Sequence, residues 1–268
     1  MIATPDKGAP GSPAPSGDDR IFRVAVLASG SGSNLQAIID RLHHPPFTIV
    51  DSEADLAPQD QAVEATPGQV TKAPPPAAAA GGGGTPTPRI EIVLVVCDVP
   101  GAKALERAER AGIRTALIPV RDFRDREEHD LALVTRLCEA EPDLVVLAGY
   151  MRLVSPSLLT AFPWRVINLH PALLPAFPGT TSIRDAVRYG VKVTGVTVHF
   201  VDVGVDTGPV IAQEAVRVKD GDTPDSLGAR IHAVEHRLLP EVVRLIAAGK
   251  VHPPLPGSRV VQVDWEAD

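Results

Sequence analysis

Two residues with catalytic chemistry stand at the end of one short apolar segment. Asn168 and His170 lie two positions apart in VINLHP, and Pro171 follows them. Alternate residues of a strand point to the same side, so we expect both side chains to face one small reacting group. Pro171 restricts His170 to an extended backbone. An amide donor beside an imidazolium is typical of an oxyanion site, and completion of the strand's own hydrogen bonds is the alternative.

The acidic loop HFVDVGVDTGP (199–209) is a second candidate. Gly204 and Gly208 stand on either side of Asp206, which predicts a tight turn that presents the carboxylate. A solvated loop charge is the alternative for Asp206. His199 lies inside the preceding apolar segment, and we interpret it as a core histidine rather than a catalyst.

The third candidate is the small-residue segment SGSGSN (29–34), which precedes a helical pattern. Glycines let the backbone approach a phosphate, and the N–H groups and dipole of a helix start favour an anion. The segment matches neither a Walker loop nor a clean dinucleotide-binding fingerprint. It therefore predicts an anion site, with a turn that merely joins strand to helix as the alternative.

The elements that must position these residues alternate between strands and helices. Such alternation predicts an α/β fold with a largely parallel sheet, covered on both faces and joined by right-handed crossovers. In such sheets ligands bind at the carboxyl ends of the strands, where all three candidates lie. The first expected strand begins at Ile21, one ends at VINL, and the others cover 90–99, 143–149, 194–202 and 209–218. The first expected helix is SNLQAIIDRL, and the others cover 102–112, 126–140, 155–162, 182–190 and 223–248.

The domain organisation follows from composition. Residues 1–20 hold almost no large apolar side chain and are predicted to be a disordered tail. One domain is expected over 21–250, interrupted at about 51–89 by a low-complexity insertion around PPPAAAAGGGG, and residues 251–268 form a C-terminal tail. Both flanks of the insertion continue the strand and helix pattern, so we interpret it as a tolerated surface insertion; a functional disordered loop is the alternative.

Charge and composition exclude several classes of function. The formal net charge is −7, which argues against sequence-independent nucleic-acid binding. The chain shows neither a signal peptide nor an apolar run long enough to span a membrane, which predicts a cytoplasmic protein that does not bind membranes. Cys97 and Cys138 lack metal-ligand spacing and are expected to be reduced core thiols, and no metal cluster is predicted.

Four motifs together resemble the phosphoribosylglycinamide formyltransferase family: LASGSGSNLQAIID, LVVLAGYMRLVSP, VINLHPALLPAFPG and VTVHFVDVGVDTGPVI. The resemblance covers about 21–50 and 90–250. It implies a Rossmann-like, mostly parallel twisted sheet with helices on both faces. It also implies transfer of a formyl group to the amine of phosphoribosylglycinamide in de novo purine biosynthesis. The donor, 10-formyltetrahydrofolate, would be a co-substrate, with no permanently bound cofactor.

The resemblance also implies residue roles. The catalytic residues would be Asn168, His170 and Asp206. The substrate would be bound by Gly32, Ser33 and Asn34, which hold its phosphate, and by His232 and Glu235. The folate would be bound by Arg126, Met151, Arg152, Leu153, Val154, Asp202, Val203, Gly204 and Val205. A cis bond between Leu174 and Pro175 is expected as well.

The chain departs from the family pattern in three places. Thr180, Thr181 and Ser182 follow Pro178 and Gly179 where many relatives have a histidine, so a hydrogen bond from that histidine is absent or made by a hydroxyl. His232 stands where a glutamine is usual, which puts the substrate contact there in doubt. The insertion at 51–89 has no counterpart.

Other functions remain as alternatives. Formyltetrahydrofolate hydrolase shares the Asn, His and Asp chemistry, but it would add an amino-terminal regulatory domain, for which residues 1–20 are too short. Methionyl-tRNA formyltransferase would add a carboxyl-terminal domain after Ala248. A noncatalytic folate- or phosphate-binding sensor would be expected to lose Asn168, His170 or Asp206. The expected partners are small-molecule substrates. The sequence does not decide the oligomeric state, and a homodimer is one of the options.

Overall fold

A computed structural model of the chain describes residues 20–43 and 88–265. Of the predicted tail at 1–20, only Arg20 is described, and of the predicted insertion at 51–89 only the last two residues. Arg89 is already the first residue of a strand. The predictions for the remainder of both segments lie outside the described residues.

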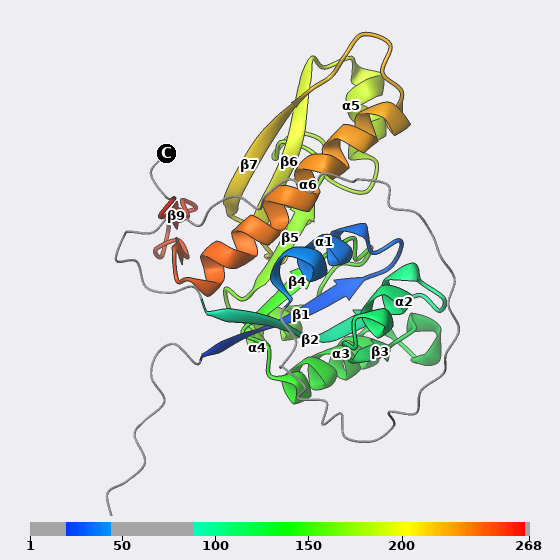
Figure 1. Ribbon diagram of the computed structural model, residues 1–268, viewed down its shortest axis with the longest axis vertical. Helices are drawn as coiled ribbons and strands as arrows, with labels where there is room; N and C mark the ends of the chain where they lie inside the picture. Colours follow the sequence, from blue (N-terminus) through cyan, green and yellow to red (C-terminus); the bar gives the residue numbers. More distant parts are fainter. Residues whose placement is uncertain (1–19, 44–87, 266–268) are drawn as a thin grey trace, which may run out of the picture. The chain divides into compact units, whose positions relative to one another are not determined.

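Seven strands form one sheet, in the order β3-β2-β1-β4-β5-β6-β7 (Figure 1). The pairings from β3 to β5 are parallel, and the pairings of β5 with β6 and of β6 with β7 are antiparallel. The prediction of a largely parallel α/β sheet is therefore confirmed. The strands are β1 (Ile21–Ala28), β2 (Arg89–Cys97), β3 (Thr115–Leu117), β4 (Leu144–Leu147), β5 (Val166–His170), β6 (Val193–Phe200) and β7 (Val210–Arg217).

Helices cover both faces of this sheet, as expected. Residues of β1 alternate between two apolar clusters: Val24 and Val26 pack on one side, and Ala25 and Leu27 on the other. The first cluster contains side chains of α1 (Ser33–Leu42), α2 (Lys103–Arg110), α5 (Ser182–Tyr189) and α6 (Pro224–Ala247). The second contains side chains of α3 (Arg126–Ala140) and α4 (Pro156–Ala161), and a short 3-10 helix spans Val120–Asp122.

Polar side chains cap the starts of three helices, α3, α4 and α6. Asp125 accepts the Glu128 N–H at 2.9 Å before α3, and Ser155 accepts the Leu158 N–H at 3.3 Å before α4. Thr223 forms a reciprocal capping box with Ser226 before α6. Such caps satisfy N–H groups that have no partner inside the helix, so the sequence determines these starting points locally.

Two parts of the structure differ from the sequence-based description. Cys97 is buried in β2 as predicted, but Cys138 is exposed on α3, so its expected place in the core is wrong. Helix periodicity alone did not locate the buried stripe, which runs through Leu133, Leu137 and Ala140. In the expected C-terminal tail, β8 (Val251–His252) and β9 (Gln262–Val263) pair antiparallel, and neighbouring valines pack on the core.

The carboxyl ends of the central strands are tied together by their backbones. The Ser29 N–H, just after β1, donates to the Gly149 carbonyl at 3.1 Å, and the Met151 N–H donates to Ser29 Oγ at 3.0 Å. The loop after β4 is therefore anchored to the turn after β1.

In the described parts of the chain, no helix is long and apolar enough to cross a bilayer.

Candidate active site

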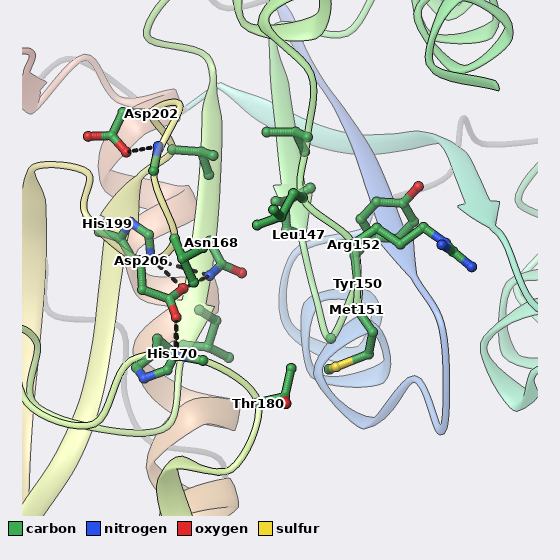
Figure 2. A pocket seen from close by; sticks show the side chains of 18 of the residues that line it. Leu147, Tyr150, Met151, Arg152, Asn168, His170, Thr180, His199, Asp202 and Asp206 are labelled. Atoms are coloured by element: carbon green, nitrogen blue, oxygen red, sulfur yellow. Dashed lines mark hydrogen bonds and ion pairs between the residues drawn. The ribbon is translucent and has the colours of Figure 1, made fainter. Parts of the chain in front are cut away.

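A cavity of about 380 Å³ opens where β4 and β5 end, beside the loop between β6 and β7 (Figure 2). Nearly all of the predicted catalytic and folate residues line it. They are Met151, Arg152, Leu153 and Val154 from the loop after β4, Asn168 and His170 from β5, and Asp202, Val203, Gly204, Val205 and Asp206 from the β6–β7 loop. Segments far apart in the sequence thus form one site, as the strand-end argument predicts.

Both ring nitrogens of His170 have polar contacts in this cavity. Its side chain is buried, with Nδ1 3.3 Å from Asp206 Oδ2 and Nε2 2.8 Å from the Phe177 carbonyl oxygen. Ser182 Oγ lies 3.3 Å from the same Nε2. Both ring nitrogens therefore face oxygen atoms that can accept hydrogen bonds.

Asp206 is turned toward His170 and Asn168 (Figure 2). Its Oδ2 accepts the Gly179 N–H at 2.7 Å, and its Oδ1 lies 3.3 Å from Asn168 Nδ2. The backbone of Asp206 is left-handed, with φ 52, which Asp tolerates better than most residues. Asp206 is therefore a largely buried, hydrogen-bonded carboxylate, with its side chain 12% exposed, rather than a solvated loop charge.

His199 belongs to this cluster, although the sequence favoured a core role alone. Its Nδ1 lies 2.8 Å from the Phe200 carbonyl, and its Nε2 lies 3.2 Å from Asn168 Nδ2 and 3.8 Å from Asp206 Oδ1. Burial lowers the pKa of His199, against the opposing effects of that carbonyl and of Asp206. The neutral ring thus donates from Nδ1 and accepts the Asn168 N–H at Nε2.

Sequence reasoning missed several other members of the site. Gly179 and Thr180 line the cavity, and the buried Ser182 approaches His170 from the start of α5. The signal that could have found His199 is strand pairing, because β5 and β6 place it directly opposite Asn168. No local pattern indicates that the loop after the proline-rich segment folds back over β5.

Two arginines hold the loop that follows β4. Arg126, from the first turn of α3, donates to the Leu153 carbonyl at 2.9 Å, and it does not line the cavity. Arg152 Nε donates to the buried Asp98 at 2.6 Å. Burial, with the nearby charge of Asp98, raises the pKa of the Tyr150 hydroxyl in the same loop. Arg126 therefore supports predicted folate residues through their backbone.

The predicted substrate residues form a second group. Gly32 caps α1 with φ 67, and a Cβ there would lie 2.7 Å from Ala104 Cα, so this turn requires glycine. Asn34 Nδ2 donates to the buried Glu235 Oε2 at 3.1 Å, and His232 Nδ1 lies 2.9 Å from the same oxygen. Asn34 Oδ1 is buried without a hydrogen-bond partner among the described residues.

Glu235 has the largest electrostatic effect on its neighbour His232 in this second group. The hydrogen bond between the Glu235 carboxylate and the His232 ring raises the pKa of His232, despite the opposing effect of burial. Burial lowers the pKa of His236, which stacks on His232 with ring centroids 6.4 Å apart. His232 also lines a neighbouring cavity that shares Pro171 and Thr180 with the first. The two groups are thus adjacent, but they do not form one cavity.

The peptide bond between Leu174 and Pro175 is cis, as the resemblance implied. This bond lies in the segment between His170 and Phe177, whose carbonyl contacts the His170 ring.

Comparisons with known proteins identify relatives of this chain. The formyl transferase family model matches residues 82–243. Phosphoribosylglycinamide formyltransferase of Bacillus subtilis is 37% identical over 222 residues, which cover 83% of this chain and 93% of that protein. The trifunctional purine biosynthetic protein adenosine-3 of Drosophila melanogaster is 38% identical over 227 residues, 85% of this chain but only 14% of the fly protein.

Solved structures agree as well. The crystal structure of glycinamide ribonucleotide transformylase 1 from Symbiobacterium toebii superposes with a TM-score of 0.71 at 40% identity, covering 91% of this chain and 94% of that one. The mostly parallel seven-stranded sheet with its helices matches the fold of that structure. The chain therefore belongs to the formyl transferase family, as a relative of the phosphoribosylglycinamide formyltransferases.

Proposed function

We propose that this protein transfers the formyl group of 10-formyltetrahydrofolate to the primary amine of phosphoribosylglycinamide, in the cytoplasmic de novo synthesis of purines. The observation that carries the proposal is the His170 ring, held between Asp206 and the Phe177 carbonyl beside Asn168, at the wall of a largely apolar cavity. Near relatives with this activity support the choice of substrates.

The reaction requires stabilisation of negative charge on one oxygen. The amine nitrogen attacks the formyl carbon, a new C–N bond forms, and the carbonyl oxygen becomes an oxyanion. Collapse of this tetrahedral centre breaks the bond to the folate nitrogen, which takes a proton while the former amine loses one. Donors placed at the oxyanion lower the barrier, because they bind charge that exists only near the transition state.

Asn168 and His170 supply those donors. Both hydrogen bonds of Asn168 Nδ2, to His199 and to Asp206, are long at 3.2 and 3.3 Å, and a developing oxyanion is a stronger acceptor than either in a dry site. Protonated His170 donates from Nδ1, the ring nitrogen that faces Asp206. The Asp206 carboxylate stabilises the imidazolium by its nearby negative charge.

The two substrates would occupy the two groups of residues. The apolar residues of the 151–154 loop and the backbone of the 202–206 loop form a slot suited to a flat pterin. Gly32, Ser33 and Asn34 offer N–H groups at the start of α1 for the phosphate. The buried carboxylate of Glu235, with the adjacent His232, would hold polar groups of the acceptor near Pro171.

The test is to mix the purified protein with 10-formyltetrahydrofolate and to follow formation of tetrahydrofolate with and without phosphoribosylglycinamide. We expect deformylation that requires the acceptor. Deformylation at the same rate without it would assign the protein as a hydrolase instead. Folate binding with no turnover under either condition would assign a noncatalytic binding protein.

A further inference from the structure

We propose that Ser182 is a positioning residue that holds His170 in its Nε2–H form, so that Nδ1 is the nitrogen that exchanges a proton during the reaction. The inference rests on the proposed function for its catalytic consequence. Its structural part, the protonation of one named ring nitrogen, can be measured without any substrate.

The hydrogen bonds at Nε2 have only one consistent direction. The Phe177 carbonyl oxygen, 2.8 Å from Nε2, can only accept, so Nε2 carries the proton. Ser182 Oγ donates its own proton to the Gly179 carbonyl at 2.9 Å. Its lone pairs are therefore free to accept at Nε2, 3.3 Å away. Both neighbours of Nε2 thus act as acceptors, and both favour a proton on this nitrogen.

The same loop also fixes the other side of the ring. The Gly179 N–H donates to Asp206 Oδ2 at 2.7 Å, and this oxygen lies 3.3 Å from His170 Nδ1. Hydrogen bonds thus join His170 to Ser182, Ser182 to Gly179 and Gly179 to Asp206, and the contact between Asp206 and His170 completes the circuit. Because Gly179 contributes both its N–H and its carbonyl, the Ser182 hydroxyl stabilises the peptide groups that orient Asp206 as well as the imidazole.

Burial prevents water from replacing the hydroxyl. Ser182 is 1% exposed and His170 is 3% exposed. Phe177 has a left-handed backbone, with φ 52, which is costly for an aromatic residue and must be maintained by its surroundings. A loop under such strain needs additional attachment, and Ser182 provides it through Gly179. The shorter contact from Phe177 makes it the main acceptor, and Ser182 the group that keeps the arrangement in place.

The same contact identifies which hydroxyl replaces the histidine that many relatives have in this loop. Thr180 lines the cavity, and the exposed Thr181 donates to Asp185 at 2.6 Å. Of these three hydroxyl residues, Ser182 is the one whose side chain contacts His170. Its hydroxyl is thus the group of this loop that meets the catalytic imidazole in this chain.

The experiment compares Ser182→Ala with Thr181→Ala, which removes a hydroxyl one residue away that contacts Asp185 instead of His170. Nitrogen-15 NMR of the unliganded protein would report the tautomer of His170, with its signals assigned by their loss in His170→Gln. We expect a protonated Nε2 in the wild type and in Thr181→Ala. Ser182→Ala should show a mixture of the two neutral tautomers at a pH where the ring is uncharged.

Kinetics provide the second readout. We expect kcat of Ser182→Ala to fall about 3- to 10-fold, the effect of one hydrogen bond, with both KM values within about 2-fold. Ser182→Thr, which restores a hydroxyl, should recover the wild-type tautomer and most of kcat. Ser182→Cys replaces either variant in the experiment if that variant fails to fold. Wild-type nitrogen shifts in Ser182→Ala would overturn the proposal, as would an equal loss of kcat in Thr181→Ala. A wild type without transfer activity but with the expected shifts would refute only the proposed function.

Discussion

At the scale of single residues, Asp206 connects the parts of the site that do chemistry. It contacts His170, Asn168 and the Gly179 N–H, and its side chain is almost fully buried. None of these partners is a group that belongs to a substrate. We therefore predict that Asp206 acts on the transition state more than on the binding of either ligand.

Asp206→Asn tests this directly, because it keeps the size of the side chain and removes its charge. We expect turnover to fall on the order of 10² to 10⁴ fold, by comparison with loss of an oxyanion donor or of a triad aspartate in other enzymes. The folate dissociation constant should change far less. Single-turnover rates and equilibrium folate binding, measured on the same variant, separate the two effects. A loss of binding as large as the loss of rate would instead place Asp206 in the folate pocket.

His232 gives a prediction about pH. Its hydrogen bond to Glu235 raises its pKa above the ordinary value of 6.5, so the charged form stabilises the folded state. This stabilisation is fully present below about pH 6.5 and is lost as the pH rises through the raised pKa. Because the His232 side chain is 53% exposed, we expect less than about 1 kcal/mol.

The measurement is urea unfolding of the wild type and of His232→Gln between about pH 5.5 and 9. The difference in unfolding free energy should be greatest at the acidic end and should shrink as the pH rises. In a Glu235→Gln background the pH-dependent part should disappear, since the partner charge is gone. A difference that is constant with pH would contradict a charged His232 paired with Glu235.

The residues of the site were predictable from the sequence where each stands at a strand end. Strand alternation predicted that Asn168 and His170 face the same side, and the glycines around Asp206 predicted its turn, but their catalytic roles were implied only by the family resemblance. His199 was missed because a histidine between apolar residues looks the same whether it lies in the core or beside a catalytic amide. Only the pairing that sets it opposite Asn168 distinguishes the two, and this pairing joins residues far apart in the chain.

At the scale of elements, the turn from β6 into β7 sets the position of Asp206. The register of the two strands shifts between Val198 and His199, and the Phe200 N–H donates to the Pro209 carbonyl at 2.9 Å. A Cβ on Gly208 would lie only 1.6 Å from the Phe200 carbonyl oxygen. This close approach of two backbones requires glycine.

Gly208→Ala should therefore displace the Asp206 loop. We expect a destabilisation of about 1–3 kcal/mol, from overpacking, and a loss of turnover of about 10²-fold from misplaced catalytic groups. Gly30→Ala is the matched control for stability, because a Cβ there meets no atom within 4 Å. Calorimetry on both variants and turnover of Gly208→Ala check the prediction. Wild-type activity in Gly208→Ala would show that the turn does not position Asp206.

The type and order of most elements could be predicted, because apolar periodicity and helix caps are local. The predicted helix over 126–140 coincides with α3, where Asp125 supplies the cap. The antiparallel direction of β6 and β7 could not be assigned in the same way. Strand direction depends on which neighbour each strand meets, and the long α6 that follows packs against both β6 and β7.

At the scale of the whole molecule, the segment that follows α1 interrupts the domain without separating its halves. His43 forms a parallel bridge with Ile90, and its Nδ1 accepts the Ile92 N–H at 3.1 Å. The two ends of the interrupted connection therefore lie side by side. A short turn could join them without moving β1 or β2.

We predict that the insertion expected at about 51–89 is dispensable for the chemistry, apart from Arg89, which belongs to β2. Replacing the insertion with a short Gly/Ser turn should leave kcat and both KM values within a few fold, because the cost of loop closure changes only slowly with length. Calorimetry would verify that the shortened protein stays folded. Loss of activity in a folded variant would mean that the segment takes part in binding or catalysis, and the insertion would then no longer be a tolerated one.

In the proposed reaction, the formyl carbon passes from folate to a phosphorylated amine in the cavity between β4, β5 and the Asp206 loop. The most direct measurement follows 10-formyltetrahydrofolate labelled with carbon-13 in the formyl group, mixed with the protein and phosphoribosylglycinamide in an NMR tube. We predict that the label appears in the formamide of the acceptor, with little free formate, and that His170→Ala abolishes its appearance. Label that accumulates as formate in the presence of the acceptor would contradict the account.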